Sequence, residues 1–447
     1  MSATIGPDFP DQKEMEGLVS LALDLSRQKG ASAAEAGISF GAGLNVTVRM
    51  SEVETLEYNR DRSLGITVYL GQRKGSASTS DWNEKAIHDA VEAACAIAKH
   101  AGEDPYSGLA DAKKMAKDIP DLDLCHPWSV SAEEAIDIAK QCEDAARAEE
   151  GISNSEGASV ATRTGINVYG NTHGFLGGYA GTRHSISCSV IAEDESGMQR
   201  DYWYSVARDV NDLEKSESVG QKAAQRTLKR LNARKLKTAQ VPVMFQAEIA
   251  SSIVQHFISA ISGGNLYRES SFLLDHLGKE VFPDFMQIQE RPHLLKALGS
   301  AAYDNEGVAT QDRALVSDGI LESYVLGSYS ARKLGMETTG NSGGVHNCQI
   351  KPGALDFNGM LADMGTGLLV TELMGQGINI VTGDYSRGAA GFWVENGELQ
   401  YPVEEITIAG NLKDMFKQIV HVGTDVDMRG NIHCGSLLIE NMTLAGE

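Results

Sequence analysis

The strongest constraint on the fold is a strict alternation of apolar and polar residues in two segments of the N-terminal third. The first segment has an apolar residue at every second position: Leu44, Val46, Val48 and Met50. The second segment repeats the pattern from Leu64 to Leu70. A period of two places all the apolar side chains on one face of a β-strand. The pattern therefore predicts antiparallel strands with one face on a core and the other in water.

Helical patterns surround these strands. Apolar residues at helical spacing begin near Met15 and stop at Gly30. Asp81 and Ser131 each precede a glutamate by three residues, which is the capping-box signature of a helix start. The helix that opens at Ser131 is expected to run to about residue 148. A further helix is expected over 211–231, which completes an N-terminal region of mixed strands and helices.

The chain changes character after a polar, basic stretch over 229–237, where glycines become frequent and strands become short. Asp318-Gly319 and Asn396-Gly397 each lie between two strand-like segments. Both dipeptides favour two-residue hairpins, because type I′ turns need a positive φ at both central positions. The second half is therefore predicted to be rich in β-structure. Its few helices are expected near 248–262, 328–334 and 411–419.

The predicted fold class is α+β: an N-terminal antiparallel sheet with helices over residues 1–235, followed by a β-rich C-terminal domain over 236–447. A Pro-containing connection over 103–130 interrupts the first region. It suggests two subregions, 1–125 and 126–235.

Composition narrows the choice of partners. The chain has 61 acidic and 39 basic residues, and its net charge is −22. Such a surface repels phosphate backbones and anionic lipids, so no nucleic acid and no membrane is expected as a partner. None of the six cysteines has C-x-x-C spacing, and Cys95 and Cys142 fall on apolar helix faces. Buried free thiols and the absence of a signal peptide or a long apolar run predict a soluble, cytoplasmic protein.

Three short motifs resemble catalytic signatures, and each has a simpler interpretation. Gly340-Asn341-Ser342-Gly343-Gly344 matches the G-x-S-x-G pattern of a serine nucleophile, but the residues before it predict no strand. Gly365-Thr366-Gly367 lacks the third glycine of a dinucleotide loop and leads into a predicted strand. The segment 123–126 brings a carboxylate, a thiol and an imidazole together in what is expected to be a solvated turn. The sequence has no His-Glu dipeptide, so it predicts no self-contained zinc peptidase site.

Five longer stretches resemble the TldD/PmbA family, also called the modulator of DNA gyrase family, and within it the TldE (PmbA) branch. They are LGITVYLGQRKGSAST from Leu64, YRESSFLLDHLGK from Tyr267, TGLLVTELMGQG from Thr366 with TGDYSRGAAGFWVENGE from Thr382, EITIAGNLKDM from Glu405, and CGSLL from Cys434. The resemblance covers nearly the whole chain from about Gly17.

This resemblance implies a function that depends on a partner. In the family, a TldD-like subunit and a TldE-like subunit pair as a heterodimer that degrades or matures unfolded peptides. The TldD-like subunit holds zinc through H-E-x-x-x-H on a helix and a later Cys-Gly. The resemblance therefore implies a TldE/PmbA-like subunit that has no cofactor of its own, shapes the substrate cleft, and works with a zinc-bearing partner.

The chain departs from the zinc motif at the corresponding helix, expected over 251–261. This segment has a single imidazole, His256, with no glutamate after it. Cys434-Gly435 matches the Cys-Gly of the metal-bearing branch. One imidazole and one thiolate fall short of the three protein ligands of a catalytic zinc site. His256 and Cys434 are therefore expected to be vestigial positions, and no catalytic or metal-binding residue is predicted.

A polar segment between Gly383 and Gly388 is the main candidate for binding substrate. Its side chains are a carboxylate, two hydroxyls and a guanidinium: Asp384, Tyr385, Ser386 and Arg387. Arg387 could hold a peptide carboxylate or carbonyl through forked hydrogen bonds. The alternative is a structural hairpin closed by an Asp384–Arg387 salt bridge. Tyr267 and Arg268 are weaker candidates for the same surface.

Two other functions stay open at this point. A peptide-binding, chaperone-like homodimer would hydrolyse nothing and would need no zinc subunit. An autonomous serine hydrolase would use Ser342, and an active-site serine probe would label it. Co-purification with a TldD-like protein would separate the chaperone-like homodimer from the leading hypothesis.

Overall fold

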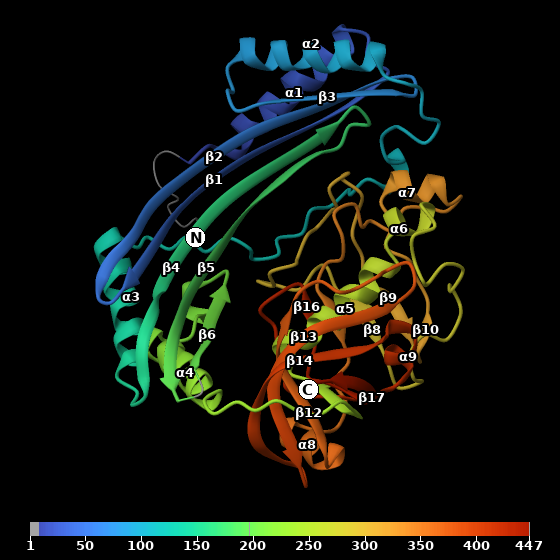
Figure 1. The fold of residues 1–447 in the computed structure, drawn as a ribbon. Helices are drawn as coiled ribbons and strands as arrows, with labels where there is room; N and C mark the ends of the chain where they lie inside the picture. Colours follow the sequence, from blue (N-terminus) through green and yellow to red (C-terminus); the bar gives the residue numbers. More distant parts are fainter. Residues whose placement is uncertain (1–8, 196, 447) are drawn as a thin grey trace.

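A computed structural model describes residues 9–195 and 197–446, and it confirms the α+β class. The N-terminal half is one long, curved antiparallel sheet of six strands in the order β3-β2-β1-β4-β5-β6 (Figure 1). The strands are β1 (Ala33–Arg49), β2 (Glu52–Leu70), β3 (Arg73–Thr79), β4 (Ile152–Asn171), β5 (Leu176–Asp194) and β6 (Gly197–Ala207). The two alternating segments lie at the end of β1 and the end of β2, and the two strands pair from Ala33–Tyr69 to Arg49–Glu52. The expectation that Met50 shares the apolar face of β1 is wrong, because Met50 lies in the turn after Arg49, with a φ of 52° and an exposed side chain.

Four helices cover one face of this sheet in two pairs, as Figure 1 shows. They are α1 (Gln12–Gln28), α2 (Glu84–His100), α3 (Ala132–Arg147) and α4 (Ser216–Lys229). Even-numbered residues of β1 point at the helices: Ile38 packs with α1 and α2, and Val46 packs with α3 and α4. Odd-numbered residues therefore point at the opposite, concave face, which lies toward the C-terminal domain (Figure 1).

The helix starts follow their capping signals with one correction. Ser131 and Glu134 form the expected capping box, with reciprocal hydrogen bonds of 3.1 and 2.8 Å. The expectation that Asp81 caps the second helix is wrong, because Asn83 accepts the hydrogen bond from the Ala86 amide at 2.8 Å. The helix expected over 211–231 begins only at Ser216, after a short 3-10 turn.

The C-terminal domain contains two sheets that share a large core with the helix α5. The six-stranded sheet has the order β14-β13-β12-β7-β17-β15, and the five-stranded sheet has the order β10-β9-β8-β11-β16. The strands are β7 (Ala239–Phe245), β8 (Ile288–Glu290), β9 (Arg313–Ser317), β10 (Ile320–Leu321), β11 (Cys348–Ile350), β12 (Gly367–Met374), β13 (Asp384–Glu395), β14 (Glu398–Asn411), β15 (Ile419–Val422), β16 (Ile432–His433) and β17 (Leu437–Ala445). Both expected hairpins are present, with positive φ at Asp318, Gly319, Asn396 and Gly397.

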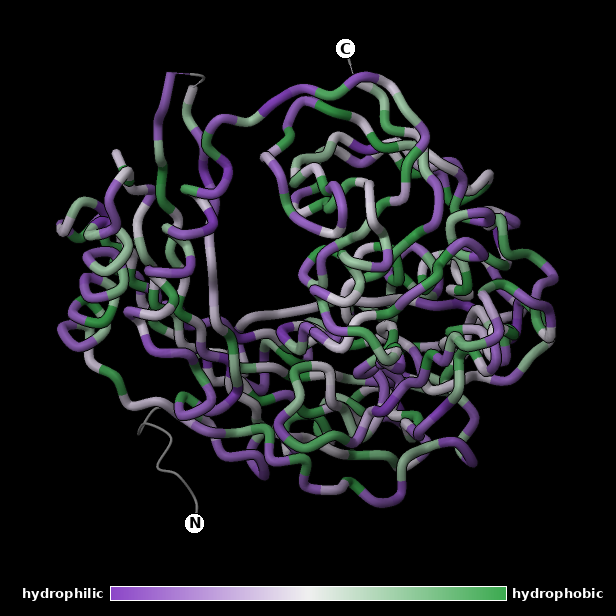
Figure 2. Tube along the Cα trace, turned by 90° about the horizontal axis from the view of Figure 1, so that it is seen from below, coloured by the Kyte–Doolittle hydropathy of each residue, from purple (hydrophilic) through white to green (hydrophobic). Residues whose placement is uncertain are grey.

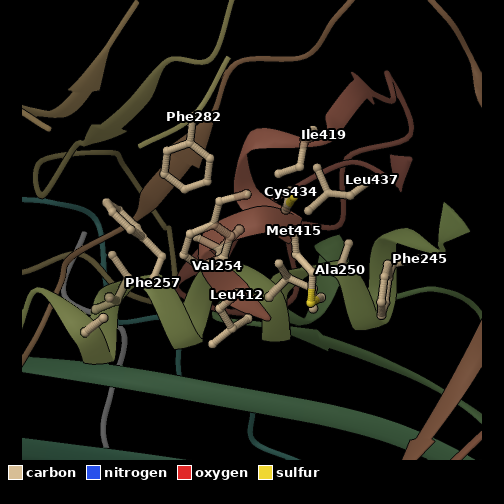
Figure 3. Packing of buried hydrophobic residues seen from close by; sticks show 14 of the residues in the cluster. Phe245, Ala250, Val254, Phe257, Phe282, Leu412, Met415, Ile419, Cys434 and Leu437 are labelled. Atoms are coloured by element: carbon tan, nitrogen blue, oxygen red, sulfur yellow. The ribbon is translucent and has the colours of Figure 1, made fainter. Parts of the chain in front are cut away.

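Five helices accompany these sheets. They are α5 (Ala247–Ala260), α6 (Gly263–Tyr267), α7 (Ser328–Lys333), α8 (Phe357–Met364) and α9 (Leu412–Lys417). Helix α5 packs its apolar face against the core through residues such as Ala250 and Val254 (Figure 3). Helices α6 and α8 were not expected, because both are short and contain glycine.

Hydrophilic and hydrophobic residues are interspersed along the described part of the chain, in the helices and strands of both halves (Figure 2). No helix in the described part of the chain is long and apolar enough to cross a membrane. Cys95 and Cys142 are buried free thiols on α2 and α3, as expected.

Candidate functional site

A cavity of about 330 Å³ lies where the last strand of the N-terminal sheet meets the C-terminal domain. Strand β6 and helix α4 form one wall, and α5, β12 and β13 form the other. Two residues that the sequence singled out lie in or next to this cavity. Arg387 of β13 lines it, and His256 lies on α5 one turn beyond the lining residue Ser252.

Five arginines and three carboxylates line the cavity: Arg200, Arg226, Arg230, Arg387, Arg429, Asp201, Glu248 and Glu372. The lining therefore carries an excess of positive charge in a chain whose net charge is −22. Arg230 bridges the two domains, with its guanidinium 2.5 Å from Glu372 and 3.6 Å from Asp201. Arg226 pairs with Asp201 and with Glu248 of α5.

Arg429 fixes the aromatic wall of the cavity. Its guanidinium lies 4.2 Å from the ring centroid of Trp203 and 4.4 Å from that of Tyr204. It also forms two 2.9 Å hydrogen bonds to Asp427 and donates to the Tyr204 carbonyl. Stacking on two aromatic rings and a bidentate pair with Asp427 restrict the orientation of the Arg429 guanidinium.

Arg387 differs from the other arginines of the cavity, because it forms no ion pair with any described residue. Its Nε atom, the Tyr385 hydroxyl and His256 Nε2 are buried with no partner in good hydrogen-bonding geometry, although the Arg387 guanidinium lies near enough to the Tyr385 hydroxyl to lower its pKa. The rings of His256 and Tyr385 lie 6.0 Å apart. Buried polar groups are normally satisfied, so three unsatisfied polar atoms close together leave capacity for a ligand.

Burial sets the protonation of this cluster. It lowers the pKa of His256 to about 4, and the nearby Arg387 charge acts in the same direction. Burial also raises the pKa of Tyr385 far above its usual value, which the Arg387 guanidinium only partly offsets. At neutral pH the cluster is one cation beside a neutral phenol and a neutral imidazole, and its guanidinium and phenol donors suit a carboxylate or a polarised carbonyl oxygen.

The prediction of a polar loop over Gly383–Gly388 is wrong in part, because strand β13 starts at Asp384 and pairs with β14. A strand sends alternate side chains to opposite faces, so Tyr385 and Arg387 point inward while Asp384 and Ser386 are exposed. Asp384 accepts hydrogen bonds from Thr382 and Asn411 rather than pairing with Arg387. The structure therefore brings together two of the four candidate side chains and excludes the proposed salt bridge.

Tyr267 and Arg268 do not line the cavity of Arg387. They lie at the end of α6, where Arg268 donates to the Tyr267 hydroxyl at 3.2 Å and Tyr267 packs against Tyr329 of α7. Their surface belongs to the α6–α7 corner of the domain.

The residues of α5 and the C-terminal Cys-Gly do not fit a zinc ion. Cys434 is fully buried in the core cluster that contains Ala250 and Val254 (Figure 3), and burial raises the pKa of its thiol. Zinc binds the thiolate, which this environment disfavours. His256 follows Val254 by two residues, about 200° around the helix. The imidazole and the thiol thus face different sides of α5 and do not converge on one metal ion.

Two of the remaining motifs take the simpler interpretations. No strand precedes Ser342, whose backbone N–H donates to Asp304 at 2.9 Å. Gly365 ends α8 with a φ of 66°, and Gly367 starts β12. The expectation of a solvated turn at 123–126 is wrong, because Cys125 and His126 are half-buried in an extended connection, where His126 lies 3.1 Å from Asp123.

One group of three metal-type side chains occurs among the described residues: His88, Asp89 and Glu92 on the outer side of α2. Glu92 is already paired with Lys29 at 2.5 Å, and the group lies far in sequence from the cavity of Arg387. An exposed acidic group of this kind is no evidence for a metal.

Sequence reasoning missed Glu248, Trp203, Arg226 and Arg429. These residues come from four segments between 203 and 429, and no local pattern links them. The one local signal was the aromatic run Tyr202-Trp203-Tyr204 in β6, which is unusual for a strand at the edge of a sheet.

Comparison with known proteins places the chain in a family. Models described as PmbA/TldA metallopeptidase domain 1, central domain and C-terminal domain match residues 34–98, 125–231 and 238–446. Metalloprotease PmbA of Escherichia coli O157:H7 is 52% identical over 437 residues, which cover 98% of this chain and 97% of that protein.

Solved structures share the fold over the full length. A Bacteroides thetaiotaomicron protein described as a candidate modulator of DNA gyrase superposes with a TM-score of 0.92 at 28% identity, covering 97% of this chain and 99% of that one. TldE from Thermococcus kodakarensis, at 21% identity, gives a TM-score of 0.81 over 97% and 100% of the two chains. This chain belongs to the PmbA/TldD metallopeptidase family.

Proposed function

We propose that this chain is the TldE/PmbA-like subunit of a TldD/TldE-type metallopeptidase that degrades or matures unfolded peptides. The chain holds part of the peptide, and hydrolysis takes place at zinc in a TldD-like partner subunit. The observation that carries the proposal is the unpaired Arg387 in a cavity between the two domains.

The chemistry of the cavity supports a peptide as the ligand. Arg387 offers a charged donor, and Tyr385 and His256 are neutral at physiological pH. A peptide presents carbonyl oxygens along its length and a carboxylate at its end, which are the acceptors such donors bind. The exposed ring of Tyr202 adds apolar contact area for side chains, whereas the rings of Trp203 and Tyr204 are already stacked against Arg429.

The possible metal ligands of this chain support hydrolysis in a partner subunit. His256 and Cys434 lie on different sides of α5, and the thiol pKa is raised. A catalytic zinc needs three protein ligands and an open position for water. Because relatives of this chain are named metalloproteases, a catalytic metal is expected in the active complex. The residues of this chain do not supply a ligand set for that metal.

The test is an Arg387→Ala variant assembled with a TldD-like partner and zinc, assayed for cleavage of an unfolded peptide. Loss of a charge-assisted hydrogen bond is expected to raise KM about 10- to 100-fold with a smaller change in kcat. Arg387→Lys should recover only part of the loss, because lysine lacks the forked donor. The matched control is Arg27→Ala, on the exposed side of α1.

Two results would count against the proposal. Unchanged kinetics in Arg387→Ala would remove the cavity from substrate binding. A chain that binds peptide but never co-purifies with a TldD-like protein would favour the chaperone-like homodimer instead.

A further inference from the structure

A second cavity, of about 580 Å³, lies between the concave face of the N-terminal sheet and the loops of the C-terminal domain. Its sheet side is formed by β4 and β5, and its other side by residues 298–305 and 343–346. A smaller hollow of about 260 Å³ adjoins it and shares Arg163 and Arg183. These two arginines therefore stand between the two hollows on the concave face.

Arg163 and Arg183 lie directly opposite each other on neighbouring antiparallel strands. Like charges in directly opposed positions destabilise a sheet, so this pair lowers the free energy of unfolding. Arg183 has no ion pair or hydrogen bond with any described residue, and Arg163 has one weak ion pair, 3.9 Å from Asp61. Both side chains are exposed to solvent, which keeps them available to a ligand.

Glycines of β1 make room for the Arg163 guanidinium on the concave face. Gly43 on β1 lies beside Arg163 in the same cross-strand row. Gly41 lies one step along, and a Cβ there would come within 2.8 Å of the Arg163 guanidinium. The guanidinium thus lies over a glycine, in space that any other residue would fill.

The rest of the lining favours an anion. No aspartate or glutamate is found among the described residues that line the 580 Å³ cavity. A third arginine, Arg208, adds positive charge, although its guanidinium already donates to three backbone carbonyls. Amide side chains of Asn167 and Asn305 add neutral donors. An acid-free basic hollow in a chain of net charge −22 attracts anions locally while the rest of the surface repels them.

We propose that Arg163 and Arg183 form a carboxylate-binding subsite that takes an acidic residue or the C-terminal carboxylate of a peptide. The proposal rests on the proposed function for the identity of the ligand as a peptide. The paired guanidinium groups hold one carboxylate between them, and its negative charge relieves their mutual repulsion. The subsite gives the protein a preference for acidic peptides.

The test measures binding of labelled, unstructured peptides to the full-length chain by fluorescence anisotropy. Four peptides separate the two sources of carboxylate: glutamate-containing or glutamine-substituted, each with a free or an amidated C-terminus. The expected result is that removing the relevant carboxylate weakens binding about 10-fold or more. Equal binding of all four peptides would overturn the proposal.

Arg163→Gln and Arg183→Gln locate the subsite. Each is expected to weaken binding of the preferred peptide about 10-fold and to leave binding of the neutral amidated peptide unchanged. Because each variant removes a like-charge repulsion, its thermal midpoint should stay the same or rise, whereas an arginine with a purely structural role would lower it when replaced. The control is Arg27→Gln on α1, which should behave as wild type.

Two outcomes distinguish this inference from the proposed function. If both arginine variants bind the acidic peptide as tightly as wild type, the proposed subsite is wrong, even if the assembled complex cleaves peptides. Carboxylate-dependent binding lost in both variants would support the subsite, even if no complex with a zinc-bearing partner forms.

Discussion

His256 is a half-buried imidazole with a fully buried Nε2 atom, and desolvation lowers its pKa in the folded protein to about 4. The unfolded chain would protonate it near pH 6.5, so the folded state binds the proton less well than the unfolded state. The free energy of unfolding is therefore highest above pH 6.5, where the imidazole is neutral in both states, and it decreases as the pH falls toward 4. Between pH 7.5 and pH 5 the loss is expected to be about 1–2 kcal/mol, allowing for partial exposure.

Replacing His256 with asparagine should remove this acid sensitivity. Urea unfolding of wild type and His256→Asn at both pH values gives the comparison, with exposed His100→Asn as the control. The same fall in stability for wild type and His256→Asn would show that the imidazole is not desolvated.

Glu290 shows the opposite behaviour, because burial raises its pKa to about 7. Asn341 and the His346 amide donate to the carboxylate at 2.6 and 2.7 Å, but these bonds do not offset its desolvation. The unfolded chain ionises Glu290 more readily, so ionisation costs stability as the pH rises from 4.5 through 7.

Glu290→Gln should therefore stabilise the fold by about 1–3 kcal/mol at pH 8, because glutamine keeps an acceptor oxygen and carries no charge. The gain should shrink toward zero as the pH falls to 4.5. Denaturation midpoints across this range, with exposed Glu322→Gln as the control, give the test. A gain that does not vary with pH would contradict the assignment.

At the scale of elements, helices α3 and α4 approach each other through a glycine. A Cβ added at Gly220 of α4 would lie 2.0 Å from the Cys142 carbonyl oxygen of α3. Gly220→Ala must push the helices apart and is expected to cost about 2–3 kcal/mol. Gly17 of α1 has no atom within 4 Å of such a Cβ, so Gly17→Ala should stabilise by about 0.5–1 kcal/mol. Thermal unfolding of both variants gives the comparison, and equal effects would contradict this packing.

Elements with a local signal could be predicted from the sequence. Strands β1 and β2 follow their alternation, the capping box of Ser131 fixes the start of α3, and Asn396-Gly397 fixes a hairpin. The start of β13 could not be predicted in this way. The segment between Gly383 and Gly388 has the composition of a loop. Pairing with β14 makes it a strand and decides which of its side chains face inward.

At the scale of the whole molecule, the candidate sites depend on how distant segments meet. The cavity of Arg387 collects residues from β6, α4, α5, β12 and β13, and the concave hollow lies between the sheet and loops more than 100 residues away. Arg387 itself could be named from the sequence, but its unpaired state depends on contacts that no local pattern records. The opposed arginines of β4 and β5 required the strand register.

On our proposal, this chain binds peptides and depends on a zinc-bearing partner for hydrolysis. The most direct measurement incubates an unfolded peptide with the chain alone, with a TldD-like partner and zinc, and with both proteins together, followed by mass spectrometry of the fragments. Efficient cleavage only in the full mixture is the expected result. Fragments produced by the purified chain alone would show that it hydrolyses peptides without a partner, and His256, Cys434 and Ser342 would then be the first residues to replace.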